Sequence, residues 1–255
     1  MRWRFLDSGA LDGAEQMAID AGLMDRARES GESVLRVYGW SRPTLSFGRH
    51  ESVRGTFDAG RLESENVGAV RRPTGGRVLM HDREVTYSVT APAPEDERLQ
   101  QSYRAINQIL VAALSRLGVS VMTAPAGTPR RPGGAACFAE PAAGELMVGN
   151  RKLVGSAQLR ERGALLQHGS ILLDDDQPRI AELAVQPLTP ALPAATLRSA
   201  LGRAATHGEV SDALRAALAV AVAGGEPEGL DAEEAARFAL PHRARFSSAE
   251  WTWRS

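Results

Sequence analysis

Segments typical of β-strands alternate with segments typical of helices along the first two thirds of the chain, and this order narrows the possible folds most strongly. The strand-like segments are rich in β-formers or alternate in polarity, and they are residues 3–8, 34–40, 44–48, 68–72, 77–82 and 84–91. The helical segments carry apolar residues at helical spacing, and they are residues 12–24 and 96–117. From residue 178 onward the chain is rich in alanine and mostly helical in pattern, most clearly at residues 210–223. We therefore predict an α+β protein in which helices pack on a mixed β-sheet, with a mostly helical C-terminal tail.

Three stretches are predicted to connect these elements. Residues 124–136 contain almost no large apolar side chain, and such a long loop in a compact domain is more often functional or mobile than idle. Gly149 and Asn150 predict a tight hairpin turn between two strands. Residues 224–230 are predicted to form a linker.

Composition excludes several classes of protein. Lys plus Arg total 30 and Asp plus Glu total 31, and this balance argues against a nucleic-acid-binding protein. The single cysteine rules out an intrachain disulfide and a metal site built mainly from thiolates. No stretch approaches the roughly 20 apolar residues of a membrane span, and the first residues lack the apolar core of a signal peptide. With 43% hydrophobic residues a sizeable core can form, so a soluble cytoplasmic protein is expected.

Cys137 is the first candidate for chemistry. A lone free cysteine is usually a small buried hydrophobe, but this one lies at the edge of the predicted loop, where a side chain can face a pocket. Lys152 follows it across the predicted hairpin. A nearby ammonium favours the thiolate, which is the nucleophilic form of cysteine. Lys152 could equally be a solvated lysine, but the small residues after it, Gly155, Ser156 and Ala157, suggest that a ligand or loop approaches this strand closely.

Residues 71–82 form the most informative segment. Gly75 and Gly76 permit backbone conformations closed to other residues and let a ligand reach main-chain N–H groups, while Arg71 and Arg72 place positive charge beside them. An ordinary turn with solvated arginines is the alternative. The segment matches neither the phosphate-binding loop nor the dinucleotide fingerprint. His81 could orient a substrate, and His168, among apolar neighbours, is taken alone more typical of a buried structural histidine.

Taken together, these motifs resemble a known superfamily. Residues 71–82 (RRPTGGRVLMHD) resemble the signature R-R-x-x-G-G-G-x-V-x-H-D of the lipoate–protein ligase, octanoyltransferase and biotin ligase superfamily. The segments CFAEP, GNRKLVGSAQLR and LLQHGSI resemble its cysteine-dependent octanoyltransferase branch, and residues 17–24 and 46–49 are similar to its first helix and second signature. The likeness runs in order from about residue 4 to residue 173. The fold it implies is the biotin/lipoate ligase catalytic-domain type, a single domain over residues 1–255 with a core at 1–177 and a helical extension at 178–255.

The resemblance also implies a chemistry. A thiolate at Cys137 would take an octanoyl group from acyl carrier protein, and the thioester would then pass it to a lysine of a lipoyl domain. That acceptor would be the glycine-cleavage H protein or the acyltransferase subunit of a 2-oxoacid dehydrogenase. Lys152 would stabilise developing negative charge in both steps. The substrate-binding residues carried over from the motifs are Arg71, Arg72, Gly75, Gly76, His81, Gly155, Ser156, Gln158 and His168. No cofactor, metal, nucleic acid or membrane is expected.

Two departures from the superfamily pattern bear on this reading. Arg77 replaces the third glycine of the ligase signature, which argues against a loop wrapped around an adenylate. Ala142, Ala143 and Gly144 stand where the family usually has a serine and an aromatic residue, which bears on acyl-chain specificity. Three alternatives stay open: an ATP-dependent lipoate–protein ligase in which Lys152 stabilises an acyl-adenylate, an amidotransferase between lipoyl domains, and a non-catalytic module that binds such domains.

Overall fold

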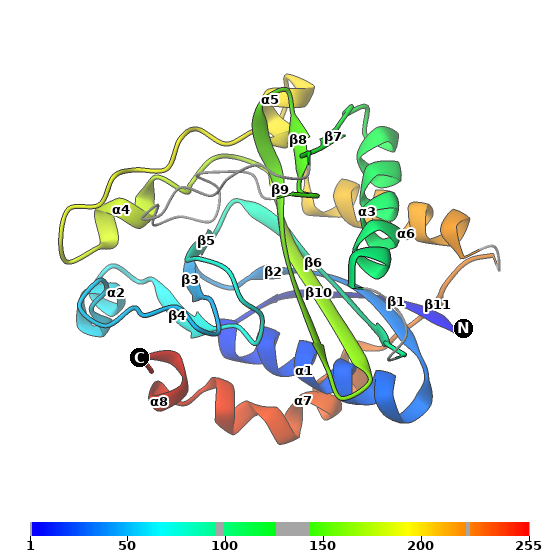
Figure 1. Cartoon of the computed structure of the whole chain (residues 1–255), viewed down its shortest axis with the longest axis horizontal. Coiled ribbons are helices and arrows are strands. Elements are labelled where there is room, and N and C mark those ends of the chain that lie inside the picture. Colours follow the sequence, from blue (N-terminus) through cyan, green and yellow to red (C-terminus); the bar gives the residue numbers. More distant parts are fainter. Residues whose placement is uncertain (1, 95–98, 126–142, 223–224, 255) are drawn as a thin grey trace.

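The computed structural model describes residues 2–94, 99–125, 143–222 and 225–254, and these form two β-sheets with helices packed around them (Figure 1). The strands are β1 (Trp3–Leu11), β2 (Ser33–Trp40), β3 (Thr44–Phe47), β4 (Gly68–Arg71), β5 (Leu79–His81), β6 (Glu84–Pro92), β7 (Met122–Thr123), β8 (Leu146–Val148), β9 (Arg151–Glu161), β10 (Ala164–Leu172) and β11 (Glu228–Gly229). The helices are α1 (Gly13–Ser30), α2 (Ala59–Ser64), α3 (Leu99–Arg116), α4 (Arg179–Leu183), α5 (Leu197–Leu201), α6 (His207–Ala221), α7 (Ala232–Phe246) and α8 (Ala249–Thr252).

The large sheet has eight strands in the order β11-β1-β2-β6-β10-β9-β8-β7. β1 is parallel to both of its neighbours, and every other pair is antiparallel, so the predicted mixed sheet is confirmed. The small sheet has the order β4-β3-β5. Because β3 lies between them, the two strands that flank the turn at residues 72–78 are not hairpin partners.

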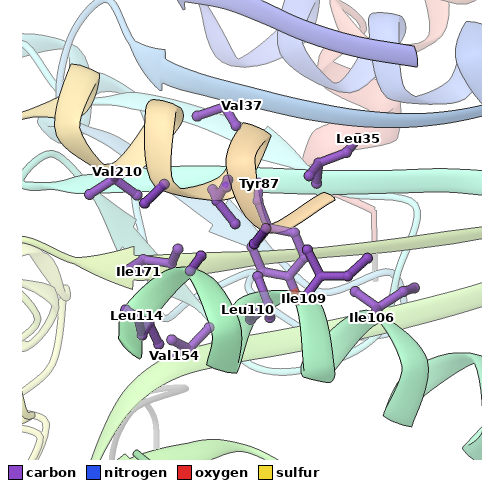
Figure 2. Packing of buried hydrophobic residues seen from close by; sticks show 14 of the residues in the cluster. Leu35, Val37, Tyr87, Ile106, Ile109, Leu110, Leu114, Val154, Ile171 and Val210 are labelled. Carbon is purple, nitrogen blue, oxygen red and sulfur yellow. The ribbon is translucent and has the colours of Figure 1, made fainter. Parts of the chain in front are cut away.

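Helices cover both faces of the large sheet, with α1 and α7 on one side and α3 and α6 on the other (Figure 1). The α3 side is closed by an apolar cluster that joins side chains such as Ile109, Leu110 and Leu114 to Tyr87 and Ile171 of the strands (Figure 2). On the α1 side, Gly22 explains why a glycine stands inside a helix. A Cβ there would lie 2.2 Å from the carbonyl oxygen of Phe238, so only glycine lets α7 pack this closely.

Most elements lie where the sequence places them. The side chain of Asp12 accepts a hydrogen bond from the backbone of Glu15 and caps α1, as predicted. Gly118, with φ +87°, follows the end of α3, and Gly149, with φ +59°, forms the predicted turn between β8 and β9. The predicted linker at 224–230 is wrong in part, because β11 lies within it and adds a parallel strand beside β1. Of the helices in the described residues, none is long and apolar enough to cross a membrane.

Candidate active site

A pocket opens between the two sheets, where the centre of the large sheet faces β3 and the turn after β4. Apolar side chains from α1, β2 and β5 form part of its wall, and they are Met17, Trp40 and Leu79. Polar side chains complete it, and they are Tyr38, Ser46, Arg72, His81, Thr86, His168 and Ser170. The remaining wall comes from small residues of β9 and β10, which are Gly155, Ser156, Ala157 and Gly169. An apolar slot with a few convergent polar groups is the usual form of a small-molecule site.

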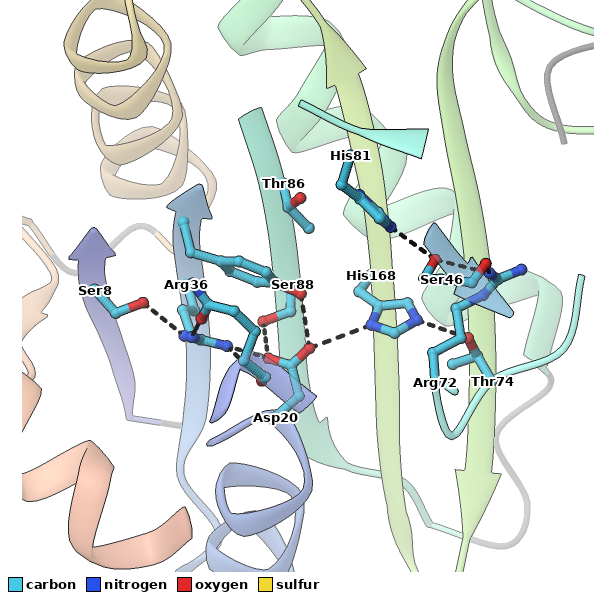
Figure 3. A network of polar contacts seen from close by, with 12 residues as sticks. Ser8, Asp20, Arg36, Ser46, Arg72, Thr74, His81, Thr86, Ser88 and His168 are labelled. Carbon is cyan, nitrogen blue, oxygen red and sulfur yellow. Dashed lines mark hydrogen bonds and ion pairs between the residues drawn. The ribbon is translucent and has the colours of Figure 1, made fainter. Parts of the chain in front are cut away.

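A buried polar network centred on Asp20 lies behind this pocket (Figure 3). The carboxylate comes from the middle of α1 and is fully buried. It pairs with Arg36 of β2 at 2.7 Å and accepts hydrogen bonds from Ser88 at 2.7 Å and Tyr38 at 3.1 Å. Burial opposes ionisation, but the Arg36 charge and the hydrogen bonds outweigh it and hold the pKa of Asp20 below its ordinary value. An ionised carboxylate of α1, paired with Arg36 of the sheet, therefore lies beneath the pocket.

His168 connects this charge to the turn after β4. Its Nδ1 lies 3.2 Å from Asp20 Oδ2 and its Nε2 lies 2.6 Å from Thr74 Oγ1 (Figure 3). Burial lowers the pKa of His168, so the ring is neutral. A neutral imidazole beside an ionised carboxylate donates from Nδ1 and accepts from the Thr74 hydroxyl at Nε2. This arrangement fixes the tautomer and holds the turn against β10.

Arg72 holds the same turn from inside the pocket. Its guanidinium donates to the carbonyl oxygen of Ser46 at 2.7 Å, to that of Gly75 at 3.1 Å and to that of Arg77 at 2.7 Å. The outside of the turn lies against the backbone after β3. A Cβ on Gly48 would lie 1.9 Å from the carbonyl oxygen of Gly76, so this approach requires glycine.

His81 of β5 also lines the pocket. Its Nδ1 lies 2.7 Å from a carboxylate oxygen of Glu84, and its Nε2 lies 2.7 Å from the Ser46 hydroxyl that also accepts from Arg72. The ring stacks on Trp40 with centroids 4.0 Å apart. These contacts lock the imidazole in one orientation at the pocket wall.

Lys152 lies near the start of β9 and is not among the pocket-lining residues. Its ammonium is buried and lies 2.7 Å from a carboxylate oxygen of Glu145. Glu145 follows Gly144, whose carbonyl oxygen accepts a 2.6 Å hydrogen bond from Asn107 of α3. Backbone hydrogen bonds also join Ala124 to both Gly144 and Glu145. The two chain segments on either side of residues 126–142 are therefore tied together next to Lys152. Cys137 and Ala142 lie outside the described residues.

Comparison with known proteins identifies the family. Residues 12–219 match the family model described as the lipoyl protein ligase A/B catalytic domain. The chain belongs to this family. It is 40% identical over 241 residues to the octanoyltransferase LipM of Symbiobacterium thermophilum, covering 86% of each chain. It is 38% identical to LipM of Kyrpidia tusciae, covering 99% of this chain and 98% of that one.

Solved structures agree on the family fold. Lipoate-protein ligase A bound with ATP matches with a TM-score of 0.80 at 19% identity, covering 99% of both chains. A bi-partite lipoate protein ligase from Thermoplasma acidophilum matches with a TM-score of 0.78 at 19% identity, covering 99% of this chain and 96% of that one. The predicted biotin/lipoate ligase type of fold is confirmed.

The structure brings together only part of the residue set that the family motifs predict. Among the predicted residues, the pocket is lined by Arg72, His81, Gly155, Ser156 and His168. Gly75 and Gly76 belong to the turn above it. Gln158 faces the α3 side and lines a separate groove with Tyr103 and Asn107. Arg71 points away from the pocket and donates to carbonyl oxygens of the loop after β3 and of residues near α8.

Several residues that build the pocket and its surroundings were not predicted from the sequence. Asp20, Arg36, Thr74 and Ser46 make the contacts that fix His168 and Arg72. A signal existed for Asp20, because a carboxylate stands between apolar residues of the first helix, where burial needs a cationic partner. The described residues hold no group of three or more His, Cys, Asp or Glu side chains suited to a metal ion.

Proposed function

We propose that the chain is an octanoyltransferase of lipoate assembly that carries the acyl group on Cys137. The observation that supports this best is its identity of 38–40% to LipM octanoyltransferases over most of both chains. The donor would be octanoyl-acyl carrier protein, and the acceptor a lysine of a lipoyl domain. An archaeal ligase of similar fold was analysed together with its E2 lipoyl domain, which agrees with such an acceptor.

The proposed reaction has two balanced steps. The Cys137 thiolate attacks the thioester carbonyl, and the carrier thiolate leaves and takes a proton. The acceptor amine then attacks the new thioester, loses a proton and releases the Cys137 thiolate as the amide forms. Each step passes through a tetrahedral intermediate that carries negative charge on the former carbonyl oxygen.

Lys152 is the proposed source of positive charge for both intermediates. Its ammonium is held by Glu145 at 2.7 Å, so its position is fixed before any substrate arrives. A charge placed in advance costs no reorganisation when the transition state forms. The tie between Glu145, Gly144 and Asn107 also joins Lys152 to the backbone that follows the segment containing Cys137.

The pocket between the sheets is the proposed site for the acyl chain. Met17, Trp40 and Leu79 offer apolar contact, and each methylene transferred from water into such a slot contributes about 0.8 kcal/mol. The small residues Gly155, Ser156 and Ala157 on β9 let a chain lie close to the sheet. Arg72 and His168 shape the turn above the slot through the contacts described.

Intact mass spectrometry after mixing the protein with octanoyl-acyl carrier protein tests the proposal. We expect one added octanoyl group that hydroxylamine removes, that Cys137→Ala abolishes, and that an apo lipoyl domain takes over. Since the chain has a single cysteine, the adduct site is unambiguous. A protein that binds a lipoyl domain without ever forming the adduct would be a binding module. Full ATP-dependent lipoylation by Cys137→Ser would instead identify a ligase.

A second experiment addresses Lys152 and uses its neighbour as the control. Lys152→Met should slow single-turnover acylation about 100-fold or more, as expected when a charge donor to the oxyanion is lost. Arg151→Met changes the adjacent, exposed residue of β9 and should acylate at the wild-type rate. Circular dichroism must show that both variants are folded. Equal acylation rates for the two variants would remove Lys152 from the mechanism.

A further inference from the structure

Two adjacent arginines at the end of β4 point in opposite directions. Arg72 enters the pocket, whereas the Arg71 guanidinium is fully buried on the outer side of the small sheet. Among the described residues, the hydrogen-bond partners of Arg71 are all carbonyl oxygens, and it forms no ion pair there. Burying a charge is costly unless its donors are satisfied. The carbonyl oxygens around Arg71 satisfy these donors in place of a carboxylate.

The carbonyl oxygens come from two segments far apart in the sequence. Nη1 donates to Gly48 at 2.6 Å and to Glu51 at 2.7 Å, in the loop after β3. Nε donates to Trp251 at 3.1 Å and to Thr252 at 3.0 Å, at the end of α8. Nη2 reaches Arg254 at 2.9 Å. The planar guanidinium of Arg71 thus joins residues 251–254 to residues 48–51 through hydrogen bonds.

The C-terminal residues return these contacts. The indole Nε1 of Trp251 donates to the carbonyl oxygen of Arg71 at 2.8 Å, and a guanidinium nitrogen of Arg254 donates to that of Arg49. Arg54 donates to the carbonyl oxygen of Trp253 at 2.7 Å, and the Trp253 ring packs on Phe47 with centroids 5.5 Å apart. Hydrogen bonds are therefore donated in both directions between the two segments, and residues 251–254 and the loop after β3 form one packed unit.

This unit supports the turn above the pocket. Arg49 N–H donates to the carbonyl oxygen of Thr74 at 2.7 Å, and Val78 N–H donates to the Glu51 carboxylate at 2.8 Å. Gly48 lies against the Gly76 carbonyl. Thr74 is the residue whose hydroxyl bonds to His168 in the pocket wall. A continuous set of contacts therefore runs from residues 251–254 through Arg71 and residues 48–51 to the pocket.

The geometry points to Arg71 as a positioning residue that uses the C-terminal segment to hold the pocket turn at residues 74–78 in place. Arg72 holds this turn from the inside, and Arg71 holds it from the outside through the loop at 48–51. Residues 251–254 then contribute to the geometry of the pocket. The kinetic part of the inference rests on the proposed function, because it is read as acyl transfer to Cys137.

The test compares Arg71→Lys with Arg61→Lys. A lysine keeps the charge, but its three donors on one compact ammonium cannot reach all five carbonyl oxygens that the planar guanidinium of Arg71 contacts. Arg61 is the matched control, because its guanidinium also donates to carbonyl oxygens, those of Ala184 at 2.8 Å and Glu182 at 2.7 Å, on a part of the molecule that does not support the turn. Trp251→Phe removes the indole donor to Arg71 and keeps an aromatic ring beneath Arg245 and Arg254, so it is the milder second variant if Arg71→Lys does not fold.

Backbone hydrogen exchange is the first readout and does not depend on the proposed function. In Arg71→Lys the amides of Arg49 and Val78 should exchange faster, on the order of tenfold, because a hydrogen bond from a charged group is worth roughly one decade in an equilibrium. In Arg61→Lys those amides should stay at the wild-type rate while that of Val185, which bonds to Thr56 beside α2, exchanges faster. Unchanged exchange at Arg49 and Val78 in both Arg71→Lys and Trp251→Phe would overturn the inference.

Single-turnover acylation is the second readout. For Arg71→Lys we expect the maximal rate of octanoyl transfer to Cys137 to fall about tenfold, and for Arg61→Lys no change, at a temperature where both are folded. If acylation by Arg71→Lys equals that by Arg61→Lys, Arg71 is structural only and the positioning role is refuted. If the wild-type protein forms no acyl-enzyme, the proposed function fails, and the exchange arm alone decides whether Arg71 holds the turn.

Discussion

The two faces of the large sheet are both buried and both hold an apolar cluster, but the polar network that reaches the pocket lies on the α1 face. On the α3 face, leucine, isoleucine and valine side chains fill the space between strands and helices (Figure 2). On the α1 face, Asp20, Arg36, Ser88 and His168 form a connected polar network that reaches the pocket (Figure 3). Apolar packing is non-directional, whereas each hydrogen bond and ion pair fixes an orientation. We infer that the α3 face mainly supplies stability and the α1 face mainly supplies the geometry of the site.

Replacing Asp20 breaks the polar face at its centre and should have the largest effect. Asp20→Ala leaves Arg36 buried without its carboxylate, and breaking one side of a buried pair costs about 3–5 kcal/mol of unfolding free energy. Urea denaturation measures this loss. Asp20→Asn, which keeps part of the hydrogen bonding, should lose less. If Asp20→Ala proves as stable as the wild-type protein, the network does not hold this face together.

Truncating a core leucine on the other face sharpens the comparison. Leu110 lies 1% exposed among the side chains of α3, so Leu110→Ala should reduce the unfolding free energy by about 3 kcal/mol. Because Leu110 is in the apolar cluster and not in the pocket wall, the acylation rate per folded molecule should stay at the wild-type value. A folded Leu110→Ala protein with greatly slowed acylation would show that the two faces are not separable in this way.

The sequence predicts features that depend on local patterns better than features that depend on long-range pairing. The helices and most strands follow from local patterns, as in α3, where apolar side chains recur at helical spacing and Gly118 ends the helix. The division into two sheets was not predicted, because β2 and β3 look alike locally and only long-range pairing separates them. β11 was missed for the same reason, since two residues beside β1 carry no periodic signal.

For the site, the motifs predicted several of the residues that face the pocket, but not the hydrogen-bond partners of these residues. Arg72, His81 and His168 do line it, but nothing in the local sequence indicates that Asp20 and Thr74 bind the two nitrogens of His168. Arg71 and Arg72 are adjacent in one motif, yet the alternation of a strand sends them to opposite sides. The direction of a side chain depends on the sheet in which its strand lies, and a motif does not contain that information.

A pH titration of stability tests the polar face with a smaller effect. The pKa of His168 is lowered from its ordinary value of 6.5, so below about pH 6.5 the unfolded chain binds a proton that the folded chain does not. Stability should therefore be complete above this pH and fall as the pH drops below it, by up to about 1.4 kcal/mol per pH unit. His168→Gln should remove this part of the pH dependence. Asp20 also has a lowered pKa, and its contribution should be lost at lower pH, below its ordinary value of 3.8.

Removing the Thr74 hydroxyl should have the smallest effect on stability and a measurable effect on the rate of acylation. Thr74→Val deletes the donor to His168 Nε2 while keeping the shape of the side chain, which should cost about 1 kcal/mol of unfolding free energy. The ring would keep its bond to Asp20, but the turn at residues 74–78 would lose its link to β10. We expect slower acylation of Cys137 in Thr74→Val and near wild-type acylation in Thr74→Ser, which retains the hydroxyl. Equal acylation by the two variants would mean that Arg72 and residues 48–51 hold the turn without help from the polar face.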